Sequence, residues 1–302
     1  MLIAHVERYI SLRQKLGYKL RDVSGDLRGF TKFAADRSDT HIRVATAVDW
    51  ATEASSPHAR YVRMRNVVNL ARFLHAEDPT HEVPCNPFLA SKYRRLPYVY
   101  APYEIVQLVR AASRLRESYP LRRQIYRTLV GLIAATGLRI SEALDLRLTD
   151  VLPDGVLQIR RTKFGKSRLV PLHPTAADAV DRYLEDRRRL AVTDDHVFLS
   201  AGNQRISSSM VEYTFGRMRQ LAGIAPARTR PPRIYDLRHT FATRALEQCP
   251  MRREAVARHF VALATYLGHS DIAHTYWYLE ATPNLMIDMA TAAEELVAGE
   301  GI

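Results

Sequence analysis

Tyr235-Asp236-Leu237-Arg238-His239 is the first of three short stretches on which the interpretation of the whole chain rests. The other two are Leu267-Gly268-His269-Ser270 and Thr275-Tyr276-Trp277-Tyr278. Each stretch holds one polar group that suits a phosphate. Arg238 has a planar, permanently charged guanidinium, and His269 can donate a hydrogen bond whether neutral or charged. Tyr278 has a hydroxyl that can attack phosphorus. Together these groups favour chemistry on a phosphodiester.

An arginine far upstream completes the set. Arg139 lies in Ala135-Thr136-Gly137-Leu138-Arg139-Ile140-Ser141-Glu142-Ala143-Leu144, two residues after a glycine that is typical of a helix end. Apolar residues at helical spacing predict a helix over about 121–136 and a short helix after Arg139, in which Glu142 can orient a neighbour. Taken alone, an arginine in this position is more often a surface residue. A chain reversal at the glycine would instead aim it into a cleft.

The order of these groups resembles the tyrosine recombinase (phage integrase) family over most of the chain. Thr-Gly-Leu-Arg-Ile-Ser-Glu-Ala-Leu at 136–144 is similar to the family's first arginine box, and Leu-Arg-His-Thr-Phe-Ala-Thr at 237–243 to the second. Leu-Gly-His-Ser at 267–270, with Tyr278 nine residues after the histidine, resembles the third box and its nucleophile. Any one box is weak support, whereas three boxes in order carry the resemblance.

Between the arginine boxes the sequence predicts a β-hairpin. Residues 157–161 and 168–172 alternate apolar and polar side chains, with a glycine turn between them. This hairpin resembles the family's own, whose leading lysine is the general acid. Aligned on Val170-Pro171-Leu172, that lysine is Lys163, and Lys166 is the competing choice. For either lysine, a plain contact with backbone phosphate is the alternative role.

The resemblance implies a phosphodiester transesterification that needs no cofactor. Tyr278 would attack phosphorus and give a 3′-phosphotyrosyl enzyme, which stores the bond energy so that strands are rejoined without ATP. Arg139 and Arg238 would bind the non-bridging oxygens. Lys163 would protonate the leaving 5′-oxygen, and His269 would donate a hydrogen bond to the same phosphate.

Two features of this site leave alternatives open. Where the family usually carries a histidine three residues before the second arginine, this chain has Tyr235, which is chiefly a hydrogen-bond donor at neutral pH and a poor base. The proton acceptor for the nucleophile is therefore open, and the nearby His239 and His274 each have a structural alternative. Tyr276 is the fallback nucleophile, because three successive aromatic residues at 276–278 are also typical of a packing cluster.

Composition favours a globular protein with a polyanionic partner. The 302 residues are enough for two domains, and a formal net charge of +12 favours DNA, although a solvated basic surface is the plain alternative. No apolar run reaches membrane-spanning length, and no secretory pattern opens the chain. The two cysteines lack metal-ligand spacing. We expect a cytoplasmic, nucleoid-associated protein with no metal or nucleotide cofactor.

The first 77 residues predict a small helical domain, which the resemblance assigns to the core-binding (SAM-like) half of a clamp around DNA. Ser56-Pro57 is typical of a helix start, and the helix that follows has a basic face. An exposed basic face without a partner is the alternative. The candidate DNA contacts in this helix and elsewhere are Arg60, Arg63, Arg65, Arg72, Lys92, Arg94, Arg95, Lys166, Arg230 and Arg233.

Five prolines from Pro79 to Pro102 predict a linker between two domains. The expected organisation is a core-binding domain at 1–77, a linker at 78–101, a catalytic domain at 102–282 and a C-terminal helix or tail at 283–302. The expected fold class is mainly α with a small antiparallel β-sheet (α+β). The apolar run at 197–199 predicts one further short strand.

Double-stranded DNA is the expected partner. The resemblance alone implies a homotetramer, or a complex with related recombinase subunits, on paired DNA sites. Two other functions stay open: a DNA-binding accessory protein that keeps the fold without cleaving, motivated by Tyr235, and a type IB topoisomerase-like enzyme that relaxes DNA. Strand exchange between two sites would separate recombination from relaxation.

Overall fold

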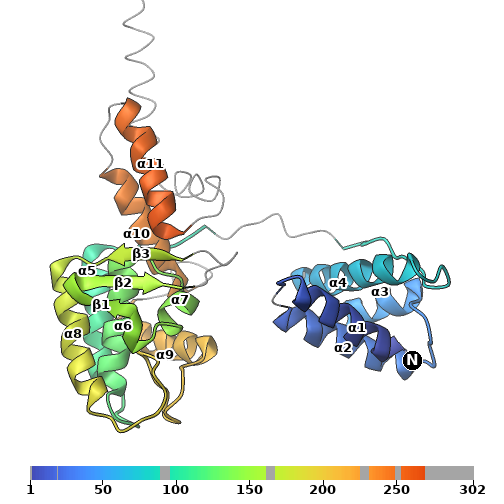
Figure 1. Ribbon diagram of the computed structural model, residues 1–302, viewed down its shortest axis with the longest axis horizontal. Coiled ribbons are helices and arrows are strands. Elements are labelled where there is room, and N and C mark those ends of the chain that lie inside the picture. Colours follow the sequence, from blue (N-terminus) through green and yellow to red (C-terminus); the bar gives the residue numbers. More distant parts are fainter. Residues whose placement is uncertain are drawn as a thin grey trace, which may run out of the picture. The chain divides into compact units, whose positions relative to one another are not determined.

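The computed structural model describes residues 2–18, 20–88, 96–160, 167–224, 231–248 and 253–268 (Figure 1). The chain divides into two compact units, Met1–Arg95 and Leu96–Ile302. Each unit has a hydrophobic core of its own. None of the helices in the described ranges is long and apolar enough to cross a membrane.

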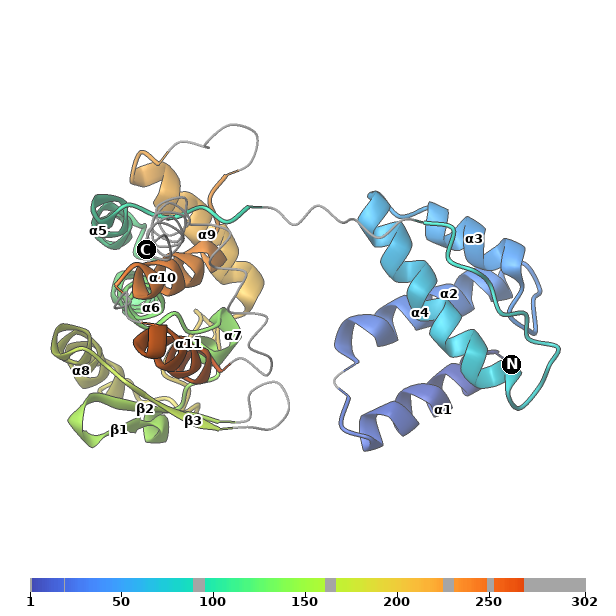
Figure 2. The same cartoon turned by 90° about the horizontal axis from the view of Figure 1, so that it is seen from above.

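The first unit is helical (Figures 1 and 2), with α1 (Leu2–Lys15), α2 (Arg21–Ala35), α3 (Val44–Thr52) and α4 (Pro57–His75). Apolar side chains from all four helices form its core, among them Phe30 and Trp50. The hydroxyl of Ser56 accepts a hydrogen bond from the backbone N–H of Ala59, and proline occupies the first position of α4. The helix start predicted from Ser56-Pro57 is therefore confirmed.

The segment after α4 packs on the first unit. His81 is 1% exposed, and its Nδ1 accepts a hydrogen bond from the Ile42 N–H at 3.1 Å. Glu82 donates its N–H to Ile42 O and accepts from the N–H of Val44 at the start of α3. The first unit thus includes residues beyond position 77, because these contacts order a segment whose prolines exclude it from a helix.

The second unit combines helices with a small antiparallel sheet. Its helices are α5 (Pro102–Ala111), α6 (Arg122–Thr136), α7 (Ile140–Leu144), α8 (Pro174–Arg188), α9 (Ser208–Leu221), α10 (Tyr235–Glu247) and α11 (Arg253–Leu267). The sheet has the order β1-β2-β3, with β1 (Val151–Leu152), β2 (Val156–Ile159) and β3 (Arg168–Pro171). Short 3-10 helices η1 (Ala112–Arg114), η2 (Leu148–Asp150) and η3 (Pro153–Gly155) connect these elements. The expected fold class, mainly α with a small antiparallel sheet, is confirmed.

Helix α6 is held on several sides, because it packs against α5, α8 and α10. Its residues Ile125, Leu129, Leu132 and Ile133 are all buried, as their helical spacing predicts. Burial on several faces fixes the position of its C-terminal end, where the first arginine box begins.

Strands β2 and β3 form the predicted hairpin, with Leu157 opposite Val170 and Ile159 opposite Arg168. The prediction of a strand at 197–199 is wrong. Leu199 forms only an isolated bridge with Arg205. The apolar run reflects burial instead, since Phe198 stacks on Tyr183 of α8 with ring centroids 5.5 Å apart.

Candidate active site

The turn after α6 places the first arginine box against α10 and α11. Gly137 has a left-handed φ of 62°, and a Cβ added there would lie 2.6 Å from Cδ1 of Phe241 and 3.0 Å from Cδ2 of Leu267. Glycine is required for both reasons, since the backbone conformation is strained for other residues and the neighbouring side chains leave no room. Arg139 follows two residues later.

Arg139 contacts its own short helix and the end of α11. Its Nη1 donates to Glu142 Oε1 at 2.7 Å, and its backbone N–H donates to Glu142 Oε2 at 3.1 Å. Its Nη2 donates to the carbonyl of Gly268 at 3.1 Å. The guanidinium is thus held by protein groups, and the side chain as a whole is 29% exposed.

Arg238 lies on α10 and is 1% exposed. Its Nη1 donates to the carbonyl of Gly137 at 2.6 Å, and its Nη2 donates to the carbonyl of Leu267 at 2.9 Å. Arg139 and Arg238 therefore bind the neighbouring carbonyls of Gly268 and Leu267. The structure brings the first two arginine boxes together at the residues that directly precede His269.

Glu142 lies between two arginines. Arg168, the first residue of β3, donates from Nη1 to Oε1 at 3.1 Å and from Nη2 to Oε2 at 2.8 Å. Burial raises the pKa of the Glu142 carboxyl, but the hydrogen bonds and charge of Arg168 and Arg139 outweigh burial and hold the pKa below its ordinary value. Sequence reasoning missed Arg168, because strand alternation gives no sign of a partner 26 residues away.

Tyr235 occupies the first position of α10, one helical turn before Arg238, and is 42% exposed. Its ring meets that of His239 edge-on, with centroids 4.9 Å apart. Burial lowers the pKa of His239 to about 4, against the opposing effect of the Asp236 charge. His239 is therefore neutral and weakly basic at pH 7, which makes it a poor proton acceptor for a tyrosine nucleophile.

The start of α10 is fixed by a buried carboxylate. Asp236 is 0% exposed and accepts hydrogen bonds from the backbone N–H of Arg233 at 2.8 Å and from its Nη2 at 3.1 Å. This pairing sets the entry of the chain into α10 and thereby the direction of Arg238. The side chain of Arg233, a candidate DNA contact, is still 45% exposed.

The four candidate arginines of helix α4 form two pairs that differ in what their side chains contact. Arg60 donates to Ala54 O at 3.0 Å, and Arg63 donates to Trp50 O at 3.3 Å, so both turn back onto their own unit. Arg65 and Arg72 are exposed and lie seven residues apart, on one face of the helix. The other predicted site residues lie outside the described ranges: Lys92, Arg94, Arg95, Lys163, Lys166, Arg230, His269, Tyr276 and Tyr278.

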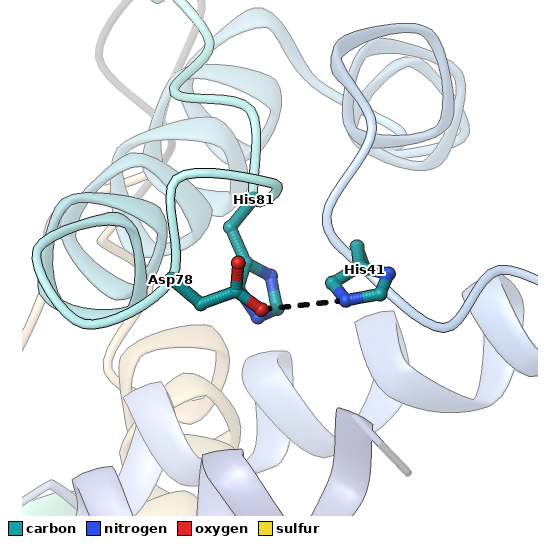
Figure 3. A group of neighbouring side chains, drawn as sticks. All are labelled: His41, Asp78 and His81. Carbon is teal, nitrogen blue, oxygen red and sulfur yellow. Dashed lines mark ion pairs between the residues drawn. The ribbon is translucent and has the colours of Figure 1, made fainter.

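His41, Asp78 and His81 are close enough in the first unit to be tested as a metal site (Figure 3). His41 Nε2 lies 3.4 Å from Asp78 Oδ2. The Nδ1 of His81 accepts the Ile42 N–H, so a neutral His81 ring carries its proton on Nε2 and has no second lone pair for a metal. The group is better described as a polar contact that joins the segment after α4 to the loop before α3.

Comparison with known proteins places this arrangement in one family. The sequence model described as "Phage integrase family" matches residues 100–284. The integrase/recombinase y4rB of Sinorhizobium fredii is 35% identical over 93% of each chain, and the tyrosine recombinase XerD of Caulobacter vibrioides is 32% identical over 84% of this chain and 81% of that protein. A lambda integrase dimer bound to a COC′ core site has the same fold, with a TM-score of 0.62 at 19% identity over 90% of this chain and 96% of that one.

The chain belongs to the phage integrase family. It is a tyrosine recombinase, an enzyme of site-specific DNA recombination, as the resemblance of its three boxes predicts.

Proposed function

We propose that this recombinase cuts and rejoins double-stranded DNA through a covalent 3′-phosphotyrosyl intermediate on Tyr278. The observation that supports it most is the convergence of Arg139 and Arg238 on the carbonyls of Gly268 and Leu267. His269 follows Gly268 directly in the chain. Both guanidinium groups therefore contact the two residues that precede His269 in the chain, which supports the binding of one phosphate by all three residues.

Each residue has a definite part in the proposed reaction. The Tyr278 hydroxyl gives its proton to solvent water and its oxygen forms a bond to phosphorus, while the bond from phosphorus to the 5′-oxygen breaks and Lys163 gives that oxygen a proton. Arg139, Arg238 and His269 donate hydrogen bonds to the non-bridging oxygens, whose negative charge grows in the transition state. One such preorganised donor contributes roughly 3–4 kcal/mol. Attack of a free 5′-hydroxyl on the phosphotyrosine reverses the steps and rejoins a strand.

Tyr235 takes a binding role in this scheme. Its position one turn before Arg238 and its exposed fraction of 42% suit a phenol that donates to a phosphate oxygen. It is too weak a base at neutral pH to deprotonate Tyr278. This supports an enzyme that cleaves more slowly than one with histidine at the same position.

Each unit supplies residues that we propose contact DNA. In the first unit, Arg65 and Arg72 lie exposed on one face of α4 and suit contacts with the phosphate backbone. Lys92, Arg94 and Arg95 are further proposed phosphate contacts. In this scheme, the core-binding domain predicted at 1–77 extends through the segment of His81 and Glu82, and the rest of 78–101 is the linker. Residues 102–282 act as the catalytic domain, and 283–302 as the tail that joins protomers of a tetramer on paired sites. The nucleoid is the corresponding location.

A trapping experiment tests the reaction. The protein is incubated with DNA that carries its recombination site, nicked so that the fragment carrying the 5′-hydroxyl diffuses away, and the products are separated on a denaturing gel. We expect a protease-sensitive adduct that disappears in Tyr278→Phe and persists in Tyr276→Phe.

The alternatives give different gels. An adduct that persists in Tyr278→Phe and disappears in Tyr276→Phe would identify Tyr276 as the nucleophile. Tight DNA binding without any adduct would contradict the proposal and support a non-cleaving accessory protein. Adduct formation with relaxation of supercoiled plasmid, but no joining of two sites, would support a topoisomerase-like activity.

A further inference from the structure

We propose that Arg168 is a positioning residue for DNA cleavage: it holds Glu142, and through it Arg139, in register with the end of α11. This inference rests on the proposed roles of Arg139 and His269. Arg168 itself is not proposed to touch DNA. Its side chain is 10% exposed, and its guanidinium donates to the Glu142 carboxylate and to the carbonyl of Tyr266.

The contacts of Arg168 join three parts of the site. Its Nη1 and Nη2 form the two-pronged ion pair with Glu142, and its Nε donates to the carbonyl of Tyr266 at 2.7 Å. The first contact reaches α7, the second reaches the last turn of α11, and Arg168 itself begins β3. One planar group therefore sets the spacing between the hairpin, the first arginine box and the segment that leads into His269.

Glu142 makes Arg139 depend on Arg168. Oε1 accepts from the Nη1 atoms of both arginines, while Oε2 accepts from the Arg139 N–H and from Arg168 Nη2. With Arg168 present, the Glu142 charge is shared between two guanidinium groups. Without Arg168, Arg139 is the one counter-ion that the described residues leave to the buried Glu142 carboxylate, so its guanidinium is drawn toward Glu142 and away from a phosphate.

Gly268 shows how closely Arg168 is fitted. A Cβ added at Gly268 would lie 2.5 Å from Arg168 Nη1 and 2.8 Å from Cζ, and the residue has a φ of 67°. The guanidinium thus packs on the glycine backbone whose carbonyl binds Arg139. Lysine could supply the charge at position 168, but its single ammonium cannot reproduce the fork to Glu142 together with the bond to Tyr266.

The test separates positioning from folding. Full-length Arg168→Gln, Arg168→Lys and Glu142→Gln are compared with the wild type and with Arg189→Gln, which removes a solvent-exposed arginine paired with Asp186 on α8. Thermal unfolding, affinity for the nicked DNA and single-turnover cleavage of saturating DNA are measured for each protein. We expect Arg168→Gln to keep its DNA affinity within a few-fold and to cleave about 100-fold more slowly, the size of effect that a small misplacement of a reactive group produces.

A modified substrate gives a second measurement of the cleavage defect, one that a loss of folding alone would not change. A methylphosphonate at the scissile position removes the charge of one non-bridging oxygen, so the transition state needs less stabilisation by Arg139. We expect the cleavage defect of Arg168→Gln to shrink at least ten-fold on this DNA. The double variant Arg168→Gln/Glu142→Gln should cleave no more slowly than Arg168→Gln, because both changes disturb one coupled unit.

Several results would overturn this inference: cleavage at the wild-type rate in Arg168→Lys, a cleavage loss matched by lost folding or DNA affinity, or a defect that is equal on both substrates. If Arg168→Gln does not fold, Arg168→Lys and Glu142→Gln carry the same comparison. These results differ from the one expected if the proposed function itself is wrong. In that case the wild type would form no adduct that depends on Tyr278.

Discussion

Arg139, Arg168 and Arg238 gather positive charge around the end of α11, where Glu142 is the carboxylate that pairs with two of them. Arg238 donates to the backbone carbonyls of Gly137 and Leu267. Taken together, these three arginines and Glu142 carry an excess of positive charge. Such an excess suits a phosphate that gains negative charge during the reaction.

Tyr235→His should speed cleavage. A histidine here can both donate to the phosphate and accept a proton near neutral pH, whereas the phenol can only donate. We expect the single-turnover rate to rise by on the order of ten-fold, toward the lower end of what a positioned acid or base contributes. The rate should also acquire a dependence on a group with a pKa near 6.5. Unchanged or slower cleavage would show that the phenol is itself required.

His239 should make the protein acid-sensitive. Since burial lowers its pKa from 6.5 to about 4, the unfolded chain binds more protons than the folded protein between these values, and stability is lost as the pH falls. We expect this residue to contribute about 2 kcal/mol of lost stability between pH 7 and pH 5. Urea unfolding across this range should show a shallower pH dependence in His239→Gln, and an equal slope would contradict the assignment.

Single residues differ in how far the sequence reveals them. Arg139 and Arg238 could be chosen beforehand because each lies in a local pattern, and the structure brings them together. The interactions of Arg168 depend on tertiary contacts with α7 and α11, which no local spacing encodes. The burial of His239 likewise follows from packing around α10, so its lowered pKa could not be predicted from its type.

Among the elements, the turn between α6 and α7 has the strictest requirement. Gly137→Ala should destabilise the protein by about 2 kcal/mol or more, because the left-handed φ disfavours a side chain and Phe241 and Leu267 occupy its space. Gly131→Ala is the matched control, since it lies within α6 and a Cβ there meets no neighbouring atom within 4 Å. That change should stabilise by roughly 0.5–1 kcal/mol. Denaturant unfolding of both variants makes the comparison.

Helix α4 should contribute to DNA binding through one face only. Arg65→Gln together with Arg72→Gln should weaken binding and lower the slope of log affinity against log salt by about 2, as the loss of two phosphate contacts implies. Arg60→Gln together with Arg63→Gln should mainly lower stability, because these side chains bind backbone carbonyls of their own unit. Equal salt slopes in both double variants would show that the exposed face does not contact phosphate.

The ends of helices can be predicted from the sequence when the residues that determine them lie within a few positions of the boundary. Ser56-Pro57 begins α4 and Gly137 ends α6 because caps and left-handed glycines act within a few residues. The apolar run at 197–199 wrongly predicts a strand, because residues that are buried without pairing in a sheet produce the same pattern. The brief strand β1 was missed because two residues are too short to show alternation.

For the whole molecule, the boundary of the first unit can be tested by truncation. A fragment of residues 1–88 retains the contacts of His81 and Glu82 with Ile42 and Val44, whereas a fragment ending at 77 lacks them. We expect 1–88 to unfold cooperatively and to be more stable than 1–77 by about 2 kcal/mol or more, from the lost hydrogen bonds and helix cap. Circular dichroism during urea unfolding measures the difference, and equal stability would place the boundary at 77.

The fit of Arg168 against Gly268 also constrains how this protein can change over generations. A substitution at position 268 would meet the guanidinium as well as an unfavourable backbone conformation, and a shorter residue at 168 would leave Glu142 with Arg139 alone. Neither position can drift independently. Arginine at 168 and glycine at 268 should therefore be kept or lost together in sequences that descend from this one. Descendants that still cleave DNA should retain both residues.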